Sequence, residues 1–90
     1  MLFRSSDIYL SASQANDGSI WIAWQTLRSG KGEIVARRLH NGSWSSEYPI
    51  TAPSEGDRWE PSVAAVDHQT AWIAHDTYYH GNYDVYVERF

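Results

Sequence analysis

Short stretches rich in isoleucine, valine, tryptophan and tyrosine alternate with turn-forming residues along the chain, and this pattern predicts strands rather than helices. Asn16-Asp17-Gly18 and Asn41-Gly42 favour tight hairpin turns, because Asn, Asp and Gly tolerate left-handed backbone conformations. The predicted strands are Tyr9–Ser13, Ser19–Gln25, Glu33–Leu39, Trp44–Thr51, Ser62–Val66, Thr70–His75 and Tyr83–Phe90. We therefore expect an all-β protein.

Two of these strands are apolar without alternation, at Ile20–Trp24 and Ala71–Ala74. A sheet with one face in water would alternate polar and apolar residues, so a continuous apolar run predicts a strand that is covered on both faces. This favours small antiparallel sheets that stack face to face. Trp21 and Trp72 lie within these runs and are predicted to be core residues.

The pattern also repeats. Trp21-Ile22-Ala23 returns as Trp72-Ile73-Ala74, an offset of 72 − 21 = 51 residues. The same offset, without a gap, carries Ser11 onto Ser62, Thr26 onto Thr77, Gly30 onto Gly81 and Arg38 onto Arg89. A period of about 50 residues is typical of stacked repeat units. We divide a single module, residues 1–90, into repeat one at about 8–58 and repeat two at about 59–90.

Within one repeat, a small-residue strand, a turn, a Trp-containing strand, a Gly-containing loop, a further strand and Asn41-Gly42-Ser43-Trp44 follow one another. This order resembles a four-stranded β-propeller blade. Pro61-Ser62-Val63-Ala64 and Gly81-Asn82-Tyr83-Asp84-Val85-Tyr86 are similar to blades of bacterial propellers of the sialidase-like and TolB-like (WD40-like) type. The resemblance covers most of the chain, but its motifs are structural and occur with many functions. It implies two antiparallel blades, the second without its outer strand.

Two full units would need 2 × 51 = 102 residues, and propellers close with about 4–8 blades. The chain is therefore expected either to be a fragment of a larger propeller or to assemble head to tail into a closed ring. Two, three or four copies would give four, six or eight blades. Three is preferred, because some small fucose-binding lectins of bacteria and fungi build six blades from three two-blade chains. Residues near Leu2–Ser5 are expected to pair with the open edge at Tyr83–Phe90 of a neighbouring copy.

Composition and charge indicate which classes of partner the chain could bind. The net charge is −4 and the positive residues are scattered, whereas nucleic-acid binding usually needs a basic face. No apolar run approaches the roughly 20 residues of a membrane span. Neither nucleic acid nor a membrane is therefore expected as a partner. There is no cysteine, but the chain has five Trp and six Tyr residues, whose large side chains suit surfaces that another copy covers.

No residue constellation indicates an enzyme. The carboxylates of the second repeat are spread along the chain rather than paired for acid–base chemistry, and no Gly-x-Ser-x-Gly elbow occurs. Only Gly18 and Trp21 match the Asp-box of sialidases. The histidines lack the spacing of zinc motifs, so neither a metal nor a cofactor is expected. His75 occupies the position of Trp24 in the other repeat and is expected to pack at a strand end.

Ligand binding by aromatic side chains is the sharper candidate, because sugars stack on Trp and Tyr while polar residues bond their hydroxyls. If the blade resemblance holds, one rim of the ring gathers Trp24, Gln25, Arg28, Asp57, Arg58, Trp59, Glu60, His75, Asp76 and Tyr79, bordered by Tyr78, His80 and Asn82. The alternative is that Trp24 and Trp59 wedge between blades. Fucose-binding lectins hold the sugar with an Arg on the second strand and a Glu on the third, and the corresponding stretches Ile20–Trp24 and Ile34–Arg38 lack that pair.

The sequence therefore leaves three functions open. The first is a non-enzymatic propeller module that assembles with copies of itself. The second is a carbohydrate-binding lectin with aromatic sites on its rim. The third is a piece of a larger sialidase-like or TolB-like protein whose chemistry lies elsewhere.

Overall fold

The structure is a computed structural model and describes residues 7–27, 32–49, 57–79 and 81–90. These residues form strands and no helix, which confirms the all-β prediction. The strands are β1 (Asp7–Gln14), β2 (Ile20–Thr26), β3 (Glu33–His40), β4 (Ser43–Trp44), β5 (Tyr48–Pro49), β6 (Asp57–Ala65), β7 (Ala71–Tyr79) and β8 (Asn82–Arg89). This part of the chain accordingly holds no helix that could cross a membrane.

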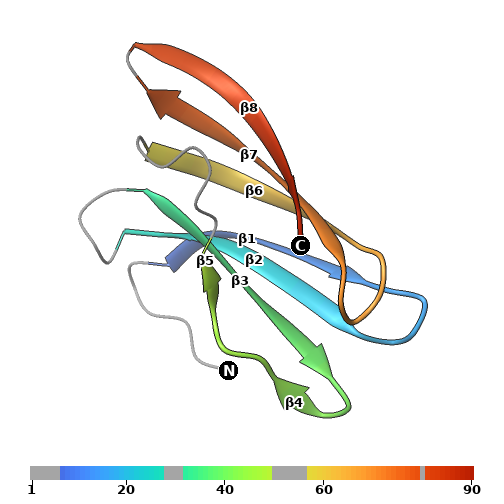
Figure 1. The fold of residues 1–90 in the computed structure, drawn as a ribbon. Coiled ribbons are helices and arrows are strands. Elements are labelled where there is room, and N and C mark those ends of the chain that lie inside the picture. Colours follow the sequence, from blue (N-terminus) through green and yellow to red (C-terminus); the bar gives the residue numbers. More distant parts are fainter. Residues whose placement is uncertain (1–6, 28–31, 50–56, 80) are drawn as a thin grey trace.

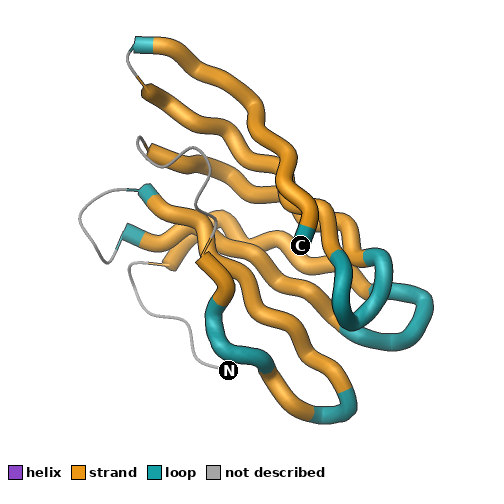
Figure 2. Tube along the Cα trace, in the orientation of Figure 1, coloured by secondary structure: helices purple, strands orange, loops and turns teal. Residues whose placement is uncertain are grey.

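The strands form two antiparallel sheets, one after the other along the chain (Figures 1 and 2). The first sheet has the order β1-β2-β3-β4, and β5 pairs with β3 as well. The second sheet has the order β6-β7-β8. Asn41 and Gly42 close the turn from β3 to β4 with φ angles of 50° and 78°, as their residue types predict.

The sequence repeat is also a repeat of strand register. Trp21 lies opposite Arg38 in the first sheet, and Trp72 lies opposite Arg89 in the second. Every partner pair of β1 with β2 recurs, 51 positions later, in the pairing of β6 with β7. Both inner strands also shift register at the same place, between Ile8 and Ser11 in β1 and 51 positions later in β6. The two sheets are therefore the same structural unit built twice.

The outer strand of the first sheet differs from the prediction. Instead of one strand over Trp44–Thr51, β4 and β5 flank an interruption at residues 45–47. Ser45 causes it: its N–H donates to the carbonyl of Arg38 at 2.8 Å, while its Oγ accepts the Arg38 N–H at 2.9 Å. Because a hydroxyl takes the place of a ladder carbonyl, the regular pairing stops there.

The inner strand of the second sheet, β6, lies against β1, β2 and β3 of the first (Figure 1). The core between the sheets contains Trp21, Ala23, Ile34, Ala36, Val63, Ala71 and Ile73. In an antiparallel sheet, alternate residues of an edge strand direct their N–H away from the paired strand. In β6 the N–H groups of Val63 and Ala65 donate to the hydroxyls of Ser11 and Ser13, at 3.2 and 3.0 Å.

The prediction that both apolar strands are covered on both faces is confirmed for β2 and wrong for β7. In β2 the outward residues Ile22 and Trp24 form a second buried cluster with Val35. In β7, Ile73 is buried against the first sheet, but Trp72 is 46% exposed. Trp72 is therefore not a core residue of the single chain, because the described residues place no sheet over it.

Candidate functional site

The predicted rim residues lie at the end of the sheets where β2 ends and β6 begins, and the structure divides them by exposure. The buried members are Trp24, Gln25, Arg58 and His75. The exposed members are Trp59, Glu60 and Asp76. Asp57 and Tyr79 are placed by register only, opposite Tyr78 and Asn82. Arg28 and the bordering His80 lie outside the described residues, as do Leu2–Ser5.

The buried side chains at this end join the two sheets. The Gln25 Oε1 accepts the Glu60 N–H at 3.4 Å, and the Gly32 carbonyl accepts the Arg58 N–H at 3.0 Å. A Cβ on Gly32 would lie 2.8 Å from the Arg58 carbonyl oxygen, so the strand backbone comes close at this point. Gln25 and Arg58 therefore belong to the packing between the sheets rather than to a surface.

His75 has a packing role, as its position predicts. Its Nδ1 lies 3.1 Å from the Thr77 Oγ1, and its ring stacks on Tyr86 with centroids 6.1 Å apart. Both His75 and Thr77 are buried on the side of the second sheet that faces the first. His75 is thus held in the interior, out of reach of a surface ligand.

The exposed rim residues form a short row on the second sheet. Trp59 lies directly opposite Asp76, so the two side chains share one face of the sheet. Tyr78 lies two residues beyond Asp76 on the same strand and is therefore on the same face. Trp59 and Tyr78 are 38% and 39% exposed. The row offers two aromatic surfaces on either side of a carboxylate.

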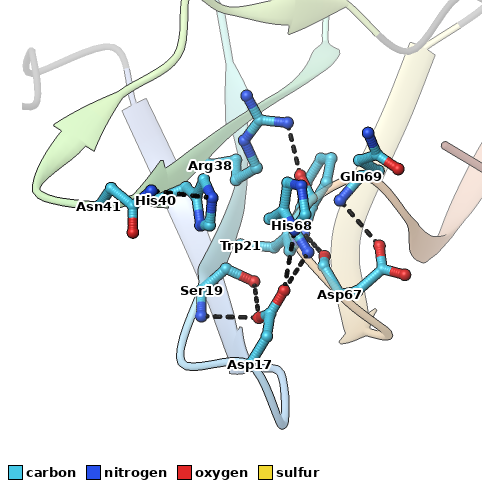
Figure 3. Close-up of polar contacts among 9 residues, drawn as sticks. All are labelled: Asp17, Ser19, Trp21, Arg38, His40, Asn41, Asp67, His68 and Gln69. Atoms are coloured by element: carbon cyan, nitrogen blue, oxygen red, sulfur yellow. Dashed lines mark hydrogen bonds and ion pairs between the residues drawn. The ribbon is translucent and has the colours of Figure 1, made fainter.

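A second polar cluster joins the sheets at their opposite end (Figure 3). Asp17, in the turn after β1, faces His68, in the turn after β6. The Asp17 Oδ2 accepts the His68 N–H at 2.8 Å and lies 3.1 Å from the His68 Nδ1. The His40 ring stacks on the His68 ring, with centroids 4.1 Å apart and planes 8° apart. Two turns from different sheets are thereby clamped together.

Two long side chains of the first sheet hold the same turn of the second. The Trp21 Nε1 donates to the Asp67 carbonyl at 2.8 Å, and Arg38 donates from Nη1 to the His68 carbonyl (Figure 3). Arg38 also lies over the Trp21 ring, with Cζ 5.9 Å from the centroid. Trp21 is therefore a core residue with a specific polar contact.

Asp17 is the one acid whose titration the structure clearly shifts among the described residues. The Ser19 hydroxyl donates to Oδ1 at 2.6 Å and the Ser19 N–H at 2.9 Å. The two bonds from Ser19 hold the pKa of Asp17 well below its usual value, against an opposing effect of burial, and the bonds from His68 lower it further. Asp17 therefore stays charged under ordinary conditions and anchors the clamp.

The clamp holds one turn of each sheet against the other. Within the described ranges, no three histidine, aspartate or glutamate side chains lie close enough together to bind a metal ion. From the sequence, His40 and His68 were compared only with metal-binding motifs, and the clamp was not predicted. A signal was present in the repeat, because Asp17 and His68 are equivalent positions, 51 residues apart, in two turns at the same end of stacked units.

The most extended candidate surface is an apolar face that occurs twice. The occupied face of the first sheet is formed by Trp21, Ala23, Ile34 and Ala36, and the second sheet covers it. The open face of the second sheet is formed by the equivalent residues Trp72, Ala74, Val85 and Val87. Trp21 and Ile34 are 2% and 0% exposed, whereas Trp72 and Val85 are 46% and 70% exposed. Equivalent residues are thus buried in one sheet and bare in the other.

The strand that covers the occupied face also has an uncovered duplicate. Pro61 and Val63 of β6 are buried against the first sheet. Their equivalents in β1, Leu10 and Ala12, are exposed, and Leu10 is 53% accessible. Each chain therefore contains one complete interface between sheets, and also an open face and an exposed strand that repeat parts of it, while Ile22, the equivalent of the interface residue Ile73, is already buried in the first sheet. No protein-family model matches the chain, and no curated protein or solved structure matches it either.

Proposed function

We propose that this chain is a non-enzymatic assembly module, whose open face binds β1 of a second copy head to tail. One observation carries the proposal: the interface between the two sheets has an equivalent on the same chain, with the open face of the second sheet as one half and β1 as the exposed part of the other half, in which Ile22 is already buried. Val85 and Val87 lie on one half, and Leu10 lies on the other. Fully burying a Val or Leu side chain contributes about 1.5–3 kcal/mol, which favours covering both halves.

The contact would be heterologous, because a sheet of one copy meets a different strand of the next. Contacts of this kind build a ring when the rotation closes and a filament when it does not. With two blade-like sheets per chain, a closed propeller would contain two, three or four copies. Three copies remain the preferred number on the resemblance to two-blade lectins.

Light scattering during size-exclusion chromatography, over a range of protein concentrations, tests the proposal. The wild-type chain is expected to give a discrete species of two, three or four copies. Val85→Glu and Leu10→Glu are each expected to give monomers, because each damages one half of the contact. Ser43→Glu, at an exposed position of β4 on the other edge, is the matched control and should assemble like the wild type.

Mixing the two variants distinguishes head-to-tail contact from other geometries. The chain with Val85→Glu keeps an intact β1, and the chain with Leu10→Glu keeps an intact open face. Together they should form a one-to-one heterodimer that neither forms alone. If only Val85→Glu blocks assembly, two open faces meet each other instead. A monomeric wild-type chain would contradict the proposal and favour a fragment of a larger propeller.

Carbohydrate binding is a second candidate, favoured by the row of Trp59, Asp76 and Tyr78. Aromatic rings can stack on the apolar face of a sugar while the carboxylate accepts bonds from its hydroxyls. A glycan array probed with the wild-type chain and with Trp59→Ala tests it. Binding that Trp59→Ala abolishes without changing the mass in solution would support a lectin, and no binding to any glycan would remove this candidate.

A further inference from the structure

The hydrogen bonds that hold the second sheet on the first come in large part from three side chains. Apart from Ser13, Asp17 and Gln25, which also accept backbone N–H groups of the second sheet, the donors or acceptors of the first sheet are Ser11, Trp21 and Arg38. They bond to backbone groups of the second sheet, the Val63 N–H, the Asp67 carbonyl and the His68 carbonyl. All three side chains therefore form hydrogen bonds with the backbone of β6 or of the turn that follows it.

The repeat keeps these three residue types unchanged. Ser62, Trp72 and Arg89 stand 51 positions after Ser11, Trp21 and Arg38. Neighbouring positions on the same face change freely, since Ile34 is replaced by Val85. Ser62, Trp72 and Arg89 are exposed, and within the described residues their side chains form none of the hydrogen bonds that their equivalents form. The three bonding side chains are present twice, but they are used once.

We propose that Ser62, Trp72 and Arg89 form the hydrogen bonds of the contact between chains, which deepens the assembly proposed above and rests on it. The Ser62 hydroxyl accepts the N–H of Ala12 of the second copy. The Trp72 Nε1 donates to the carbonyl of Asn16 of the second copy. Arg89 donates to the carbonyl of Asp17 of the second copy. The partner surface is thus β1 and the turn after it.

The turn that Trp72 and Arg89 would contact in the second copy matches the turn after β6 in length and in its closing bond. The turn after β1 is closed by a bond from the Ala15 N–H to the Ser19 carbonyl at 2.8 Å. The turn after β6 is closed by the equivalent bond, from the Val66 N–H to the Thr70 carbonyl at 3.0 Å. The two turns therefore agree in length and in their closing bond, but they differ inside, where the Gly18 N–H donates to the Ala15 carbonyl at 3.0 Å and the Asp67 N–H donates to the Thr70 carbonyl at 3.2 Å.

The β1 edge is prepared in the same way. Val63, whose N–H donates to Ser11, lies opposite Ile73, and Ala12 lies opposite Ile22 in the equivalent register. The N–H of Ala12 therefore also points away from the neighbouring strand of its own sheet. The second set is incomplete, because Ala64 stands where Ser13 stands in the first and His68 stands where Asp17 stands.

Exchange of the indole N–H groups, followed by nuclear magnetic resonance, tests the bond from Trp72. Trp21 and Trp72 should both be protected in the assembled wild-type chain. On dilution to monomers, Trp21 should stay protected and Trp72 should exchange at the rate of an open side chain. The backbone N–H of Ala12 should lose its protection together with Trp72, because Ser62 of the neighbouring copy covers it.

Substitutions that remove single atoms test the energies. Trp72→Phe keeps an aromatic ring but loses the donor, and Ser62→Ala loses the hydroxyl. Each should raise the dissociation constant of the assembly roughly 5- to 100-fold, since a buried backbone group loses its hydrogen-bond partner. Trp44→Phe and Ser43→Ala, on the outer edge of the first sheet, are the matched controls and should leave it unchanged. Ala64→Ser should tighten the assembly, because it restores the hydroxyl that Ser13 supplies within the chain.

The outcomes separate this inference from the proposed function. A chain that assembles while its Trp72 indole exchanges freely, and whose affinity is unaffected by Trp72→Phe and Ser62→Ala, overturns the inference and leaves head-to-tail assembly standing. A chain that stays monomeric at all concentrations overturns both. Protection of Trp72 that Ser62→Ala weakens and Ala64→Ser strengthens supports both.

Discussion

Tyr9 and Glu60, which are 51 residues apart, both adopt left-handed backbone conformations, with φ angles of 54° and 47°. Neither residue type favours this conformation, which costs on the order of 1–3 kcal/mol outside glycine. The two residues lie at the register shifts of β1 and β6, where each strand bends before it meets the next element. The fold therefore imposes the same strained bulge on both repeats.

Glu60→Gly is expected to raise the free energy of unfolding by about 0.5–1 kcal/mol, because glycine adopts a positive φ without a steric penalty. Glu60→Val should lower it, since a β-branched residue is the least tolerant of this conformation. Urea unfolding at a concentration that keeps the chain monomeric measures both. Glu88→Gly, in β8, is the control and should be destabilising. A destabilising Glu60→Gly would contradict the bulge.

The two equivalent tryptophans should differ sharply in their effect on the single chain. Trp21→Ala removes a buried ring, its bond to the Asp67 carbonyl and its contacts with Tyr48 and Phe90. A loss of about 3–5 kcal/mol is expected, a large part of the stability of a small domain. Trp72→Ala should change the unfolding free energy of the monomer by only about 0.5 kcal/mol, since its ring is open. Equal losses in urea unfolding would show that Trp72 is covered within the chain.

Acid should weaken the clamp between the two turns through Asp17. Its pKa is lower in the folded chain than in the unfolded chain, where it is about 4, so the unfolded chain takes up the proton first. The stabilisation from Asp17 is therefore complete above about pH 5 and is lost progressively as the pH falls below the pKa that Asp17 has in the unfolded chain. Asp17→Asn should flatten the dependence of stability on pH in the acid range.

Ser19→Ala sharpens this test, because it removes the bond that contributes most to the shift. The carboxyl carbon of Asp17, followed by nuclear magnetic resonance during an acid titration, should then titrate closer to its ordinary range. Asp84→Asn, which removes one exposed charge from β8, is the control for net charge. The acid dependence of the wild type should persist in it, and an unchanged dependence in Asp17→Asn would rule out the clamp as its source.

Gly32→Ala should destabilise the junction between the sheets at the other end. The new Cβ would lie 2.8 Å from the Arg58 carbonyl oxygen, and it would also lie 3.2 Å from the Gln25 Nε2 and 3.4 Å from the Arg58 backbone nitrogen, which leaves little room to adjust. A cost of about 1–3 kcal/mol is expected, which corresponds to a fall in melting temperature of roughly 4–8 °C for each kcal/mol. An unchanged melting temperature would mean that β6 moves away freely at Arg58.

Local sequence signals predicted the regular parts of the fold because short-range chemistry decides them. Asn41-Gly42 has the residue types that a tight turn needs, and the offset of 51 predicted which strands are equivalent. The broken outer strand was missed because it depends on the Ser45 hydroxyl reaching the backbone of Arg38, a contact between strands. The predicted strand began at Ser62, whereas β6 begins at Asp57, because the strand continues through the left-handed conformation of Glu60.

The candidate surface was harder to predict than the fold. Identical residues at equivalent positions, such as Trp21 and Trp72, give identical sequence signals although one is buried and the other is open. Exposure depends on whether a further unit lies beside the residue, and the sequence of one chain does not contain that information. The predicted rim residues differ in exposure for a related reason. Gln25 is covered by β6, whereas its equivalent Asp76 is exposed.

Ser11 and Ser13 fix the alignment of the two sheets along the direction of the strands. Their hydroxyls are two residues apart, which matches the spacing of outward N–H groups along β6, so a slide of one residue would break both bonds and a slide of two would keep one. The second sheet carries Ser62 but has Ala64 in place of the other serine. The alignment of a second copy docked there would be fixed by one serine hydroxyl instead of two. Bending and shear of an assembly would then concentrate at the joints between chains, while each pair of sheets moves as a rigid block.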